Sequence, residues 1–120
     1  MIIGTSRGRS LVNNYQSIKP RVLALLEREL PTLREKYGIE TIGIFGSVSR
    51  EEDTPESDVD VVYSFRPEMD TYENLLDLED FLEDLLQRKV DLVSVEWMSE
   101  RLRICVMTEA IFCTRERGTA

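Results

Sequence analysis

The run from Ile42 to Val62 constrains the fold of this chain more than any other segment. It opens with an apolar stretch ending at Phe45, passes through Gly46-Ser47 and a polar spacer, and continues into Asp58-Val59-Asp60 before more valines. This pattern predicts two short strands joined by a turn and a loop. A carboxylate on an apolar strand is costly unless something pairs with it, so the aspartates indicate a cation-binding site.

Helical and strand-like patterns alternate along the rest of the chain. Apolar residues at helical spacing and short apolar runs predict three helices, over 20–37, 72–88 and 98–110, and three strands, over 41–45, 58–65 and 90–95. Pro31 should kink or restart the first helix, and Gly38 should end it. The order helix, strand, strand, helix, strand, helix predicts an α+β (α/β) fold, a small mixed β-sheet flanked by helices.

The length of 120 residues predicts one domain. We expect a flexible N-terminal arm over 1–17, a folded domain over 18–113 and a polar tail over 114–120. No apolar run is long enough to span a membrane, and Met1–Ser10 lacks the apolar stretch of a secretory signal. Two free cysteines are compatible with a reducing compartment, so we expect a cytoplasmic protein.

The charge and the missing residue types exclude several functions. A formal net charge of −8 repels phosphate backbones and disfavours nucleic acid as a partner. The chain has no histidine, which excludes a Ser-His-Asp triad and a histidine-ligated metal. A metal held by carboxylates would be a hard cation, and Mg²⁺ or Mn²⁺ fits best.

Three aspartates are the candidate metal ligands and catalytic residues. Asp58 and Asp60 are two apart on a predicted strand, so their carboxylates point to the same face. Asp91 lies between apolar residues of the third predicted strand. If the second and third strands are neighbours, their spacing of about 5 Å brings all three carboxylates within reach of a metal pair. Such a pair stabilises both oxygens of an in-line phosphoryl displacement.

Gly46, Ser47 and Arg50 are the candidate nucleotide-binding residues. Glycine after a strand allows a tight turn, and the serine hydroxyl with the following amides would form a cradle for the outer phosphates. Arg50 follows three residues later and could reach the same phosphates. Gly-Ser alone is an ordinary turn, and Asp-x-Asp is common in an acidic chain. Their combination with a later strand aspartate indicates a nucleotide–metal site.

The segment from Gly46-Ser47 to Asp58-Val59-Asp60 resembles the signature of the polymerase-β-like nucleotidyltransferase superfamily. The short chain and the strand Lys89-Val90-Asp91-Leu92-Val93 make it similar to the minimal nucleotidyltransferase (MNT) antitoxins of HEPN–MNT toxin–antitoxin pairs. The resemblance implies an ATP site with Mg²⁺ on a small mixed sheet. It also implies Asp58, Asp60 and Asp91 as the carboxylate set, and Gly46-Ser47 as the phosphate-binding turn.

The resemblance further implies transfer of AMP to a tyrosine of a partner HEPN toxin, which silences the toxin. Asp91 is the candidate base for the tyrosine hydroxyl, whose pKa near 10 requires help with proton loss. Two alternatives stay open: an antitoxin that neutralises its toxin by binding alone, and nucleotidyl transfer to a small molecule. The loop Ser49-Arg50-Glu51-Glu52 keeps the arginine of the family's usual Ala-Arg-Gly-Glu, but Glu51 replaces its glycine.

Overall fold

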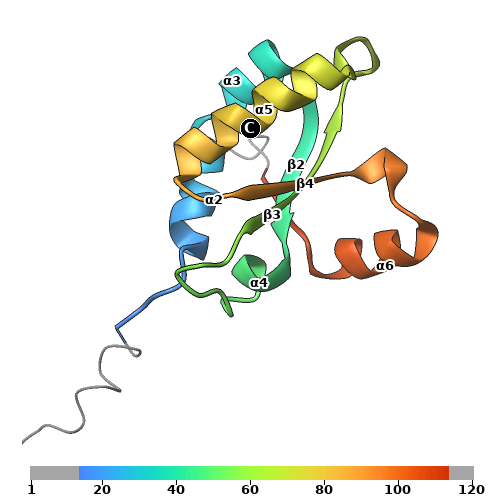
Figure 1. The fold of residues 1–120 in the computed structure, drawn as a ribbon. Helices are drawn as coiled ribbons and strands as arrows, with labels where there is room; N and C mark the ends of the chain where they lie inside the picture. The colour runs from blue at the N-terminus through green and yellow to red at the C-terminus, as the bar shows by residue number, and fades with distance from the viewer. Residues whose placement is uncertain (1–13, 114–120) are drawn as a thin grey trace, which may run out of the picture.

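The computed structural model describes residues 14–113, and its centre is a mixed four-stranded sheet (Figure 1). The strands are β2 (Ile39–Phe45), β3 (Val59–Phe65), β4 (Val90–Ser94) and β5 (Ile111–Phe112), in the spatial order β4-β3-β2-β5. β2 runs antiparallel to β3 and to β5, whereas β3 and β4 are parallel. The predicted α+β architecture with a small mixed sheet is therefore confirmed.

Among residues 14–113, five helices pack around the sheet and two short 3₁₀ turns connect elements. They are α2 (Lys19–Arg28), α3 (Leu30–Tyr37), α4 (Gly46–Ser49), α5 (Tyr72–Leu86) and α6 (Glu100–Glu109), with η1 (Pro67–Met69) and η2 (Val95–Trp97). As predicted, the first helical segment restarts near Pro31 and ends at Gly38, which adopts a left-handed conformation with φ 74°. None of the described helices is long and apolar enough to cross a membrane.

One face of the sheet forms the main hydrophobic core. Alternate residues of a strand point to opposite faces, so Val59, Val61 and Val90 share a face through the register of β3 and β4. All three are buried in a cluster with leucines of α2, α3 and α5, including Leu26. Figure 1 shows these three helices packed together on one side of the sheet. The apolar stripe predicted for the 72–88 helix is confirmed where Leu82 and its neighbours enter this core.

The opposite face carries the aspartates. Asp60, Val62 and Asp91 alternate with the core-facing valines and therefore point away from α2, α3 and α5. Val62 and Val106 of α6 are buried but lie outside the main core cluster. η2 and α6 thus flank the second face, α6 standing apart from the other long helices in Figure 1.

Asp53, in the loop between α4 and β3, ties the start of the described chain to the domain. Its carboxylate accepts hydrogen bonds from the hydroxyls of Tyr15 (2.6 Å) and Ser17 (2.5 Å) and from the amide of Ile18 (3.1 Å). The last residues of the expected arm 1–17 therefore contact the folded part. Residues 1–13 of that arm and the expected tail 114–120 lie outside the described residues.

Candidate active site

Asp60 and Asp91 lie side by side on neighbouring strands. They are direct register partners of the parallel β3–β4 pair, so both side chains leave the same face of the sheet. Asp58 precedes β3 by one residue, and its charge acts on Asp60. The sequence left open whether the second and third strands are neighbours; they are, and this pairing brings Asp91 next to Asp60.

Asp60 is the half-buried member of the three, while Asp58 and Asp91 are exposed. Burial raises the pKa of Asp60 above its ordinary value, and the negative charges of Asp91, Asp58 and Glu109 raise that pKa further. No residue of 14–113 donates a hydrogen bond to the Asp60 carboxylate. A partly buried carboxylate normally finds a donor or a cation, so the environment of Asp60 favours a positively charged ligand.

Gly46 lies in close contact with the Asp60 carboxylate. It follows β2 directly and adopts φ 78°, a conformation that favours glycine. A Cβ atom at position 46 would overlap with Oδ2 of Asp60, so the absent side chain allows the turn and the carboxylate to approach each other. Gly46-Ser47 then open the one-turn helix α4, which places the predicted phosphate-binding turn next to the aspartates.

Arg50 and Gly46 are joined by a carboxylate that the sequence did not indicate. Glu109, the last residue of α6, accepts the Gly46 N–H at Oε2 (2.8 Å) and Nη1 of Arg50 at Oε1 (2.8 Å). Arg50 also pairs with Glu52 through Nε (3.0 Å). The hydrogen bond from the Gly46 amide is the largest cause of a lowered pKa for Glu109, and Arg50 lowers that pKa further.

The carboxylates suit Mg²⁺ or Mn²⁺ by their chemistry. Hard oxygen donors beside a half-buried aspartate without a hydrogen-bond donor are the environment such cations prefer. Within 14–113, however, no three acidic, histidine or cysteine side chains are gathered closely enough to hold a metal ion as they stand. The exposed side chains of Asp58 and Asp91 would therefore have to rotate toward Asp60 to complete a metal site.

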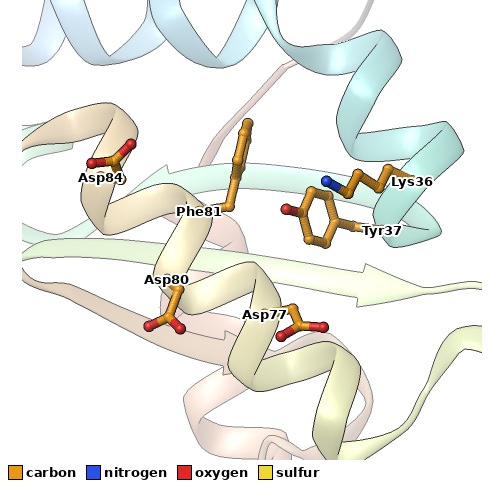
Figure 2. Close-up of a pocket in the computed structure, with 6 residues that line it drawn as sticks. All are labelled: Lys36, Tyr37, Asp77, Asp80, Phe81 and Asp84. Carbon is orange, nitrogen blue, oxygen red and sulfur yellow. The ribbon is translucent and has the colours of Figure 1, made fainter.

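Two grooves border α5. One, of about 380 Å³, lies between α3 and α5. Figure 2 shows Tyr37 and Phe81 next to each other there. Their ring centroids are 5.1 Å apart and the rings are tilted by 35°. None of the residues that line this groove belongs to the predicted site. The other, of about 250 Å³, runs between the first half of α5 and the edge strand β4 and includes Asp91. Only this second groove touches the predicted site.

Known proteins resemble the chain in sequence and in fold. The family described as "Polymerase beta, Nucleotidyltransferase" matches residues 29–117. Protein adenylyltransferase MntA of Thermococcus cleftensis is 34% identical over 89 residues, which are 74% of this chain and 89% of that protein.

Two solved toxin–antitoxin structures share the fold. One, with AMP-PNP, has a TM-score of 0.58 at 26% identity and covers 76% of each chain. The other is a complex of a tri-AMPylated HEPN toxin from Shewanella oneidensis with an MNT antitoxin. It has a TM-score of 0.54 at 22% identity and covers 81% of this chain and 77% of that chain. At this identity, the likeness establishes a shared fold and nothing further.

The family match covers most of the chain and includes both halves of the predicted site, the Gly46-Ser47 turn and the strand aspartates. The structure independently brings these halves together. The predicted resemblance is therefore confirmed: this chain belongs to the polymerase-β nucleotidyltransferase family and is similar within it to MntA-type protein adenylyltransferases.

Proposed function

We propose that this chain is a Mg-ATP-dependent protein adenylyltransferase that transfers AMP to a tyrosine of a HEPN-type toxin and thereby acts as its antitoxin. The observation that carries the proposal is the placement of Asp60. Its carboxylate stands beside Asp91, directly above Gly46, and receives no hydrogen bond from the described residues. The similarity to MntA and to the antitoxin complexes supports a protein as the acceptor.

Each site residue has a role in this proposal. Asp58, Asp60 and Asp91 would hold Mg²⁺ or Mn²⁺, which supplies positive charge against the phosphates and the carboxylates. Ser47, the Gly46 turn and Arg50 would bind the outer phosphates, since a hydroxyl, amides and a guanidinium are phosphate donors.

The transfer itself is a displacement at phosphorus. The tyrosine oxygen bonds to the α-phosphorus, the bond from that phosphorus to the bridging oxygen breaks, and pyrophosphate leaves. Asp91 is exposed at the edge strand β4, where a side chain of another protein can approach it. We assign it the proton of the tyrosine hydroxyl, because an exposed carboxylate on an edge strand can be reached by an incoming acceptor.

A surface for the partner lies on η2 and α6. Four of the six large apolar side chains that are exposed among the described residues lie there: Trp97 (80%), Ile104 (63%), Leu102 (44%) and Met107 (42%). Val106 is the only α6 residue buried by the described part of the chain, so most of this helix has no packing role there. Several large apolar side chains exposed along one short segment are typical of protein-binding surfaces. We infer that the toxin covers this segment, which adjoins the site through Glu109.

The test is incubation of the purified toxin with Mg²⁺ and ATP labelled either at the α-phosphate or at the γ-phosphate. AMP transfer predicts label on the toxin from the α-phosphate only. The Asp58→Asn/Asp60→Asn double variant should label nothing, while Asp77→Asn, an exposed aspartate of α5, should label as the wild type does. Absence of α-label, or equal α-label with the double variant, would reject the proposal.

A second candidate function is neutralisation by binding alone. The exposed apolar segment of η2 and α6 favours it, because a partner could cover that surface without any transfer. The two functions differ in what they need from the aspartates. Toxin inhibition that persists in full with the Asp58→Asn/Asp60→Asn variant supports binding alone, and its loss supports transfer.

A further inference from the structure

Glu109 holds both groups that are proposed to bind the outer phosphates. One carboxylate oxygen receives the Gly46 amide and the other receives Arg50, each at 2.8 Å. A phosphate bound at this place would also be a negatively charged group that bridges the backbone amide and the guanidinium. The carboxylate of Glu109 therefore has the charge and the contacts of an anion bound to the turn.

The fold keeps Glu109 at this position. It ends α6, and β5 begins two residues later, where Ile111 pairs with Ile44 of β2. Gly46 lies two residues after Ile44, so the pairing of β5 with β2 places Glu109 next to the Gly46-Ser47 turn. Its side chain is 31% exposed, and Arg50 is 47% exposed, so solvent and ligands reach both partners.

We propose that Glu109 is an internal anion that occupies the phosphate cradle of Gly46 and Arg50 and is displaced when the triphosphate of ATP binds. This inference rests on the proposed ATP substrate. The contacts require displacement for two reasons. The Gly46 N–H has one hydrogen to donate, so it cannot serve Glu109 and a phosphate oxygen fully at once. A carboxylate left in place would also repel the triphosphate at close range.

In this proposal, the phosphate cradle is occupied by Glu109 whenever ATP is absent. Without ATP, Glu109 satisfies the turn amide and Arg50 and holds α6 against α4. With ATP, the phosphates take over both donors and the glutamate side chain leaves them. Glu109 thus weakens the affinity for ATP, because it competes with the phosphates for the same donors. It has no such effect on ligands without phosphates.

The experiment measures ligand binding to the full chain by calorimetry, with ATP, tripolyphosphate and adenosine as probes, each with Mg²⁺. Glu109→Gln keeps the size of the side chain and removes its charge. It should lower the Kd for ATP and for tripolyphosphate by about tenfold, which corresponds to about 1.4 kcal/mol. The Kd for adenosine should not change. Glu52→Gln is the matched control, because it removes the other acid on Arg50 and leaves the Gly46 contact intact; its effect on ATP should be smaller.

Equal or weaker ATP binding by Glu109→Gln would overturn the inference, as would an equal gain for adenosine. A second measurement needs no variant: addition of Mg-ATP to the wild type should shift the amide proton resonance of Gly46 as its partner changes from carboxylate to phosphate. An unchanged Gly46 resonance at saturating ATP contradicts displacement. A wild type that binds no ATP refutes the proposed function itself, whereas a wild type that binds ATP with no gain in Glu109→Gln refutes only the role of Glu109.

Discussion

Asp60 on β3 and Asp91 on β4 are direct neighbours in parallel strands, with both carboxylates on the sheet face opposite the main core. Like charges in this arrangement repel, and the repulsion contributes to the raised pKa of Asp60. The folded protein therefore maintains an arrangement that is unfavourable in the absence of a cation. Sites that bind charged ligands commonly carry such a cost in stability.

Replacement of Asp60 by asparagine should make the folded protein more stable without metal and remove its stabilisation by Mg²⁺. Without divalent cations, Asp60→Asn should raise the free energy of unfolding by about 1 kcal/mol, or Tm by about 4 °C, because the repulsion with Asp91 is removed. Mg²⁺ should raise the Tm of the wild type and have little effect on the variant. Thermal denaturation with Mg²⁺ or with EDTA measures both effects. A variant that is less stable without metal, and still stabilised by Mg²⁺, would contradict the placement of the metal at Asp60.

Glu51 adopts φ 61°, a left-handed conformation that is strained for a residue with a side chain. Glycine, which stands at this position in the family's usual loop sequence, adopts that conformation without strain. We therefore expect Glu51→Gly to raise the free energy of unfolding by about 1 kcal/mol. Glu51→Ala removes the same charge and keeps the strain, so it should stay near the wild type. Urea denaturation distinguishes them, and equal stabilities of the two variants would contradict the backbone explanation.

Asp53 should make stability depend on pH in the acidic range. Burial raises the pKa of Asp53, but the hydrogen bonds from Ser17, Tyr15 and the Ile18 amide outweigh it and leave the pKa below its ordinary value of 3.8. A carboxyl group with a lowered pKa in the folded state contributes stability above its unfolded pKa, and this contribution is lost as the pH falls through the folded pKa. The loss should therefore begin below about pH 5.

Asp53→Asn is the variant that tests this dependence. It should lower the free energy of unfolding at pH 7 by about 2 kcal/mol, because the amide nitrogen of asparagine cannot accept these hydrogen bonds. The difference from the wild type should shrink as the pH falls below 4. Denaturation curves between pH 7 and pH 3 measure it. A difference that is constant over that range would show that the charge of Asp53 is not the cause.

Trp97 should be an energetic centre of the toxin interface. It is 80% exposed on η2, and exposed tryptophans at interfaces often carry a large share of the binding energy. Trp97→Ala should weaken toxin binding by about 2 kcal/mol, or roughly thirtyfold, and leave the Kd for ATP unchanged. Arg21→Ala is the control, since Arg21 is exposed on α2, which packs on the sheet face opposite η2 and α6. Calorimetry with the toxin decides, and equal effects of the two substitutions would place the interface elsewhere.

The sequence predicted the main elements of the fold because their signals are local. Pro31 marks the break between α2 and α3, and Gly38 marks the end of α3. The leucine stripe of α5 identifies its buried face. Boundaries differ by up to two residues: β2 begins at Ile39 rather than 41, and α6 spans Glu100–Glu109 rather than 98–110. The two-residue strand β5 was not predicted. It depends on pairing with β2 and has too few residues to show a period.

The site shows the same division between local and distant information. Asp58, Asp60 and the Gly46-Ser47 turn are close in sequence, so their spacing revealed them. Glu109 is 63 residues from Gly46, and nothing in its surroundings marks it as different from other acids of a helix end. Its role arises from the tertiary structure, through β5 and α6, which a single sequence does not specify by spacing.

Asp60 is proposed to take part in the transfer of AMP to a partner toxin. The most direct measurement is the intact mass of the toxin after co-expression with the wild-type chain or with the Asp60→Asn variant. The toxin should gain mass in whole AMP units with the wild type and keep its unmodified mass with the variant. A toxin that is unmodified in both cases, or equally modified in both, would contradict this proposal.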